Sequence, residues 1–182
     1  MGTGLKQFTD YLASVGIDRV AHTNKTYMGH LVALYRLLEA NGCSPEVCRA
    51  GMFHSIYGTE LFQGFKLSVE RRPEIRALIG ERAECLAYLN CAIDRAVFDR
   101  TAEQQTGPYR IRDRLTGEEV ELSDADFDDL CRIHLFDWLE QVGRSRKWDY
   151  RRAAYRRLAQ RLGEEAAYDA VFAQSGVRGF GS

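Results

Sequence analysis

The sequence lacks the compositional features that mark non-globular protein classes. Its 182 residues include only three prolines, so long uninterrupted helices are permitted. It has no run of about 18 apolar residues, and we therefore expect no membrane-spanning helix and no membrane partner. The formal net charge is only −1, so there is no strong field of one sign, and we do not expect a nucleic-acid partner.

The cysteines also exclude a disulfide framework. Their number, five, is odd, and no CxxC pair occurs among them. We expect reduced, mostly buried thiols and a cytoplasmic location. The five positions are Cys43, Cys48, Cys85, Cys91 and Cys131.

What the sequence does contain is apolar residues at helical spacing, bounded by caps and glycines. The stretch 109–122 instead alternates on both sides of Thr116-Gly117, which predicts a β-hairpin. The fold class we expect is all-α, a bundle with this one small hairpin. The predicted helices cover about 5–16, 26–41, 44–57, 73–80, 81–100, 124–142, 149–162 and 164–174.

The chain divides into three predicted parts. Residues 1–103 form a helical core that contains most of the candidate site residues. Residues 104–174 add the hairpin and the C-terminal helices, which we expect to pack on the same domain. Residues 175–182 are rich in glycine, and we expect a flexible tail.

Two histidines are the first candidate for a chemical site. His30 lies near the start of one predicted helix, and His54 near the end of the next. The short connection at 41–44 makes the two helices antiparallel neighbours, so both imidazoles can approach each other, as in the metal sites of helical bundles. Each histidine also sits among apolar residues, and a hydrogen-bonded core histidine is the alternative reading.

A carboxylate is needed to complete such a site, and Asp94 is the candidate. It lies in the predicted helix 81–100 between Ile93 and Ala96. An aspartate beside this much apolar surface is costly unless it is paired or bound to a cation. The alternative is a salt bridge to Arg95 or an exposed helix face.

These residues resemble the HD-domain superfamily of metal-dependent phosphohydrolases and related non-haem iron oxygenases. The segment GHLVALYRLLEANGCSPEVCRAGMFHSIYG, followed by Asp94, is similar in spacing and apolar pattern to that superfamily, loosely over residues 20–100. The resemblance implies an HD-like helical core and a divalent metal bound by His30, His54 and Asp94. This chain has Ser55 where the superfamily has the aspartate of its His-Asp pair.

Two imidazoles and one carboxylate, with further coordination positions left open, are the usual ligand set for Fe(II). Mn, Ni or Zn are the alternative metals. His22, eight residues before His30, is a candidate fourth ligand, substrate-binding residue or general base. Glu60 and Tyr57 follow His54 closely, and we assign them candidate catalytic roles: a replacement carboxylate and a hydrogen-bond donor.

Arginines supply the candidate substrate contacts. Arg71 and Arg72 follow the loop after His54 and are suited to an anionic substrate group. The basic, aromatic-rich segment 144–161 reads as a solvated face, with phosphate or nucleic-acid binding as the alternative. His134 reads as structural. The aromatic C-terminal helices could also serve a homodimer.

The function that we expect is a metal-dependent oxygenase or oxidase acting on a small organic molecule. Its basis is the ligand set that is left when Ser55 replaces an aspartate. The alternatives are a metal-dependent phosphohydrolase and a degenerate domain that binds a ligand without catalysis.

Overall fold

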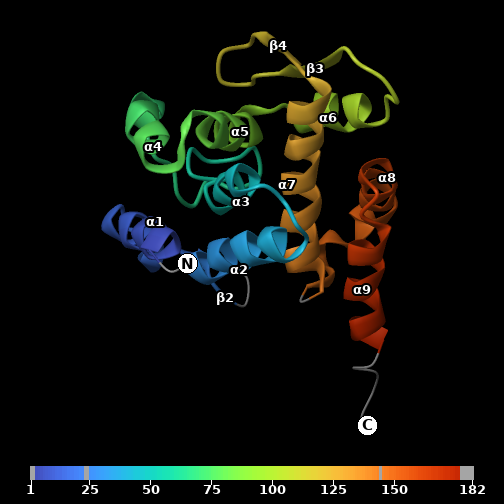
Figure 1. Cartoon of the computed structure of the whole chain (residues 1–182), viewed down its shortest axis with the longest axis horizontal. Helices are drawn as coiled ribbons and strands as arrows, with labels where there is room; N and C mark the ends of the chain where they lie inside the picture. The colour runs from blue at the N-terminus through green and yellow to red at the C-terminus, as the bar shows by residue number, and fades with distance from the viewer. Residues whose placement is uncertain (1–2, 23–24, 144, 177–182) are drawn as a thin grey trace.

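The computed structural model describes residues 3–22, 25–143 and 145–176, and this part of the chain is mainly helical (Figure 1). The α-helices are α1 (Thr3–Ser14), α2 (Tyr27–Ala40), α3 (Pro45–Met52), α4 (Arg72–Ile79), α5 (Glu81–Ala92), α6 (Arg95–Ala102), α7 (Asp124–Val142), α8 (Arg152–Leu162) and α9 (Glu165–Gly176). Three short 3₁₀ helices are η1 (Ile17–Arg19), η2 (Val69–Arg71) and η3 (Arg146–Arg151). Within the described ranges, every helix is too short or too polar to cross a membrane.

The predicted fold class is confirmed, including the hairpin. Strands β3 (Tyr109–Arg112) and β4 (Glu119–Leu122) pair antiparallel, with Tyr109 opposite Leu122. Gly117 in the connecting turn has a φ of 80°, a conformation that glycine adopts without strain. A second, smaller pair, β1 (Ala21–His22) with β2 (Lys25–Thr26), lies between α1 and α2.

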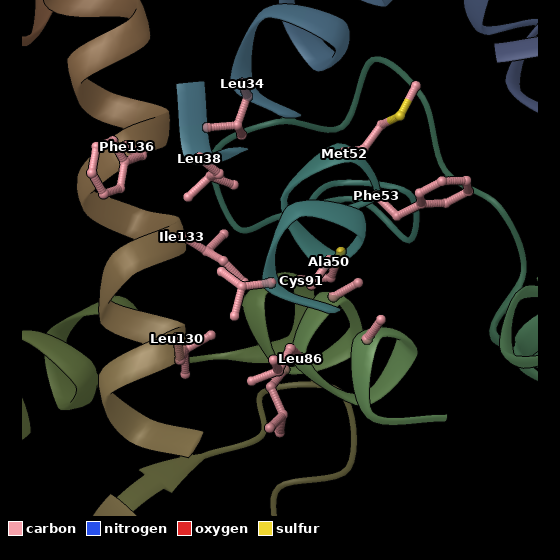
Figure 2. Close-up of a cluster of buried hydrophobic side chains, with 14 of the residues drawn as sticks. Leu34, Leu38, Ala50, Met52, Phe53, Leu86, Cys91, Leu130, Ile133 and Phe136 are labelled. Carbon is pink, nitrogen blue, oxygen red and sulfur yellow. The ribbon is translucent and has the colours of Figure 1, made fainter. Parts of the chain in front are cut away.

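Helix α7 is the central element of the molecule. Ser123 caps its first turn by accepting from the Asp126 amide. The helix packs against α2, α3 and α5 on one side and against α8 on the other (Figure 1). Leu130 and Ile133 of α7 contribute to the same buried cluster as residues of α2, α3 and α5 (Figure 2). The helices of the predicted core therefore share one apolar interior with α7.

The pair α2–α3 forms as the sequence predicted, but α3 is shorter. Ser44 caps α3, and Pro45 occupies its first turn. A Cβ at Gly51 would lie 2.3 Å from Leu38 Cδ1, so glycine is what lets the two helices approach this closely. Helix α3 ends at Met52, not near residue 57, and His54 lies in the turn that follows.

The prediction of a single helix over residues 81–100 is wrong. Ile93 adopts an extended conformation and forms an isolated bridge with Asp113, which divides the segment into α5 and α6. Asp94 becomes the N-cap of α6, and its Oδ1 accepts from the Val97 amide at 3.0 Å. At the C-terminus, α9 continues through Gly176, and the rest of the predicted tail lies outside the described residues.

Candidate metal centre

His30 is held in the first turn of α2 with one ring nitrogen already occupied. The residue is 1% exposed, and its Nδ1 lies 2.7 Å from Glu140 Oε2 on α7. An ionised carboxylate only accepts hydrogen bonds, so Nδ1 carries the proton and donates. The opposite nitrogen, Nε2, faces Asp137 Oδ1 at 3.2 Å.

The ring orientation of His54 is also fixed by a hydrogen bond from Nδ1, in this case to the backbone. Its Nδ1 donates to the Gly51 carbonyl at 2.8 Å, which leaves Nε2 directed toward Asp137 Oδ1 at 3.5 Å. Helix α5 holds the turn in place, because Asn90 Nδ2 and Cys91 Sγ both donate to the His54 carbonyl. Neither imidazole is therefore free to turn its Nε2 away.

Asp137 of α7 completes the group. One ligand atom each from His30, His54 and Asp137 lies within 4.8 Å of the others, and this is the one such group among the described residues. Metal–ligand bonds of about 2.1 Å place neighbouring ligand atoms about 3.0 Å apart at octahedral angles and about 3.4 Å apart at tetrahedral angles. The two nitrogen–oxygen separations, 3.2 and 3.5 Å, fit a shared cation.

The outer contacts fit a cation as well. Histidine ligands of metals commonly donate their second nitrogen to a carboxylate or a backbone carbonyl, which fixes the tautomer. Glu140 and the Gly51 carbonyl supply one partner of each kind. The donor set and its outer contacts therefore match a protein-bound divalent metal.

The electrostatics of the three groups differ. Burial alone would lower the pKa of His30, but its hydrogen bonds to Asp137 and Glu140 outweigh burial and raise the pKa to about 9. Burial lowers the pKa of His54; Asp137 opposes this, while the charges of His30 and Arg95 add to it. Burial would raise the pKa of Asp137, yet His54 and His30 hold it far below its usual value. The two carboxylates therefore favour the protonated form of His30.

A cavity of about 350 Å³ opens onto these ligand atoms. Tyr27 and Ser55 line it, and their hydroxyl groups are hydrogen-bonded to each other. Trp138 and Tyr155 form an aromatic wall, with ring centroids 4.7 Å apart and planes within 2° of parallel. The volume lies at the lower end of the range for small-molecule sites.

The sequence prediction of Asp94 as a ligand needs correction. Its side chain caps α6, and among the described residues it is not part of the cluster. Glu60 accepts from the Arg95 amide at 3.0 Å and is exposed, and it does not line the cavity in the described part of the chain. Tyr57 is buried and donates to Glu84 at 3.0 Å, away from the cavity lining that the described residues form.

The predicted substrate arginines also lie elsewhere. Arg71 pairs with Glu74, and Arg72 pairs with the buried Glu84, so both are engaged in structural ion pairs. His22 lies in β1, but its side chain is outside the described residues. His134 is buried and stacked on Phe98 with ring centroids 4.3 Å apart, as expected of a structural histidine.

A comparison with known families finds a match that covers most of the first 95 residues. Residues 11–95 match a family described as a domain of unknown function (DUF6817). Searches of curated proteins and of solved structures found no match. The matched segment contains both histidines and ends before α7, so Asp137 lies outside it.

The sequence prediction did not include Asp137, Glu140 or Tyr27 among the site residues. The signal for Asp137 was present, since it lies directly between the apolar residues Phe136 and Trp138. The physical argument applied to Asp94, the cost of an acid beside apolar surface, applies to Asp137 with more force. Glu140 lies three residues later, on the same face of the helix.

Proposed function

We propose that this chain is a metal-dependent enzyme with an HD-like helical core, and that it acts as a non-haem iron oxygenase or oxidase on a small organic substrate. The observation that carries the proposal is the convergence of His30 Nε2, His54 Nε2 and Asp137 Oδ1 at one end of a cavity. Two histidines and one carboxylate with open positions are typical of Fe(II) oxygenases.

The residues of this chain have separable roles in the proposal. His30, His54 and Asp137 would hold the metal, while Glu140 and the Gly51 carbonyl keep the imidazoles oriented. Bound Fe(II) would supply redox chemistry with O₂ at its open positions. Trp138 and Tyr155 contribute aromatic surface to the cavity lining, and exclusion of water by a bound substrate would strengthen electrostatic interactions within the cavity.

The position of Ser55 supports a single-metal reading of the HD resemblance. Ser55 stands where the resembled superfamily has a metal-binding aspartate, and here its hydroxyl is hydrogen-bonded to Tyr27. A hydroxyl is a far weaker metal ligand than a carboxylate, so we expect one metal ion rather than two. Asp137 would take the part of the later-helix aspartate that we had assigned to Asp94.

The test is metal analysis of protein purified without chelator, together with an anaerobic absorption spectrum. We expect about one iron per chain and spectral changes on admission of O₂ in the presence of substrate. His54→Ala should lose the metal, whereas the exposed Glu39→Gln on α2 should retain it. Full metal content in the His54 variant would overturn the ligand assignment. The absence of stoichiometric metal from wild type would overturn the metal enzyme and leave a non-catalytic ligand-binding domain.

A metal-dependent phosphohydrolase is the second candidate. The observation that favours it is the presence of Arg95, Lys147 and Arg151 in the cavity lining, since cations stabilise a leaving phosphate. Turnover of bis(p-nitrophenyl) phosphate that persists without O₂ separates the two candidates. Such turnover with Mn, Ni or Zn bound supports hydrolysis, and O₂-dependent consumption of substrate supports the oxygenase.

A further inference from the structure

The cavity beside the cluster contains cationic groups whose hydrogen-bonding capacity is incompletely used. Arg95, the first residue of α6, is half-buried and lines the cavity. Within the described ranges, its guanidinium forms no ion pair or hydrogen bond, and the contact of this residue with Glu60 is made by the backbone amide. A charge that is partly withdrawn from water is stabilised by hydrogen-bonding partners, so this guanidinium is available to an anionic ligand.

Arg95 also lies at a position in its helix that disfavours a positive charge. The N-terminal end of a helix carries a partial positive charge, which disfavours a cation in the first turn. Arg95 nevertheless occupies the first position of α6 and extends into the cavity.

Arg151 is a second arginine in the lining of the same cavity. Its terminal NH2 group is paired with Asp99 at 2.7 Å, but its Nε is buried without a hydrogen-bond partner among the described residues. Leaving a buried donor unsatisfied costs about 1–3 kcal/mol. Lys147, in η3, is exposed and adds positive charge to the lining.

From these contacts we infer that Arg95 and Arg151 form an oxyanion subsite, and that the cavity takes a small organic molecule with one carboxylate or phosphate group and an apolar body. The inference rests on the proposed function in that this molecule would be the substrate. The anion would lie against the two arginines, and the apolar body against the Trp138–Tyr155 wall. Guanidinium groups match both oxyanions with parallel hydrogen bonds.

The test is calorimetric titration of the full-length protein with benzoate, phenyl phosphate and the neutral benzyl alcohol. We expect one of the two anions to bind with a dissociation constant below about 1 mM, and benzyl alcohol to bind at least ten-fold more weakly. Arg95→Gln should weaken anion binding about ten-fold or more, and Arg95→Lys by less, because lysine keeps the charge but not the fork. Arg100→Gln, an exposed arginine of the same helix, is the matched control and should bind as wild type does.

Each titration is repeated on protein stripped of metal, so that the inference and the proposed function can fail separately. Binding that depends on Arg95 in a protein that takes up no metal would support the subsite and overturn the metal enzyme. Metal binding by the wild type, together with unchanged anion binding in the Arg95 variants, would support the metal enzyme and overturn the subsite. If neither anion binds, or if the folded Arg95 variants bind as wild type does, the subsite is wrong.

Discussion

Glu140 Oε2 lies 2.7 Å from His30 Nδ1, although the two residues are 110 positions apart in the sequence. The contact orients the imidazole so that Nε2, and not Nδ1, faces Asp137 and the cavity. Glu140 thus acts on the proposed metal through His30. The effect of Glu140 on metal affinity can therefore be measured separately from the effects of the three ligands.

We expect Glu140→Gln to weaken metal binding without abolishing it. Loss of an outer carboxylate typically costs about 10–100-fold in metal affinity, because the imidazole becomes less basic and less well oriented. Competition with a chromophoric chelator measures the affinity, and Glu39→Gln is the exposed control. Unchanged affinity in the Glu140 variant would show that its contact with His30 has no part in metal binding.

The two aspartates give a direct comparison of the predicted and the observed ligand. Asp137→Asn should lose most of the bound metal, since a neutral amide oxygen is a poor substitute for a carboxylate. Asp94→Asn should keep the metal, and because asparagine is a good helix cap, its stability should change by less than about 1 kcal/mol. Elemental analysis and thermal denaturation of both variants distinguish the assignments. Metal loss in the Asp94 variant alone would reverse them.

Gly51→Ala should destabilise the fold and disturb the site together. The added Cβ would lie 2.3 Å from Leu38 Cδ1 between tightly packed helices, and such overpacking costs about 1–3 kcal/mol. Because the Gly51 carbonyl orients His54, metal affinity should fall as well. Gly4→Ala in α1, whose nearest atom would be 4.0 Å away, is the control and should be neutral or slightly stabilising in urea denaturation.

Glu84 gives a pH dependence that does not involve the site. It is fully buried and paired with Arg72 and Arg76. Burial opposes its ionisation, but these arginines outweigh burial and lower its pKa. The stability that it contributes is therefore present above its unfolded-state pKa, about 4.3, and is lost as the pH falls through the lower folded-state pKa.

Glu84→Gln should accordingly lower the free energy of unfolding by about 3–5 kcal/mol at pH 7, since it breaks a buried ion pair. The difference from wild type should shrink as the pH falls below about 4. Urea denaturation at several pH values checks this, with the exposed Glu81→Gln on the same helix as control. A difference that stays constant from pH 7 to pH 3 would contradict the linkage.

Local signals predicted most of the helices. Ser44-Pro45 and Ser123 mark helix starts through capping, which depends on neighbouring residues alone, and both are observed. The break at Ile93 was not predictable in this way. It depends on pairing with Asp113 twenty residues later, and the apolar pattern continues through the break without interruption.

The same distinction applies to the candidate site. His30 and His54 were predictable as neighbours because one short turn fixes the geometry of α2 and α3. The third ligand depends on how α7 packs across that pair, which is a tertiary relationship. Asp94 and Asp137 both lie among apolar residues, and only the packing of α7 distinguishes the helix cap from the ligand.

The packing of α7 also determines when the centre can exist during folding. His30 and His54 come together through a local connection, whereas Asp137 and Glu140 arrive only when a segment distant in sequence docks against α2. Contacts between such distant segments form slowly, because a long loop must first close. A nascent chain that ends before α7 would hold the two imidazoles without the carboxylate of the proposed ligand set. Acquisition of the ion would therefore mark the completion of tertiary assembly.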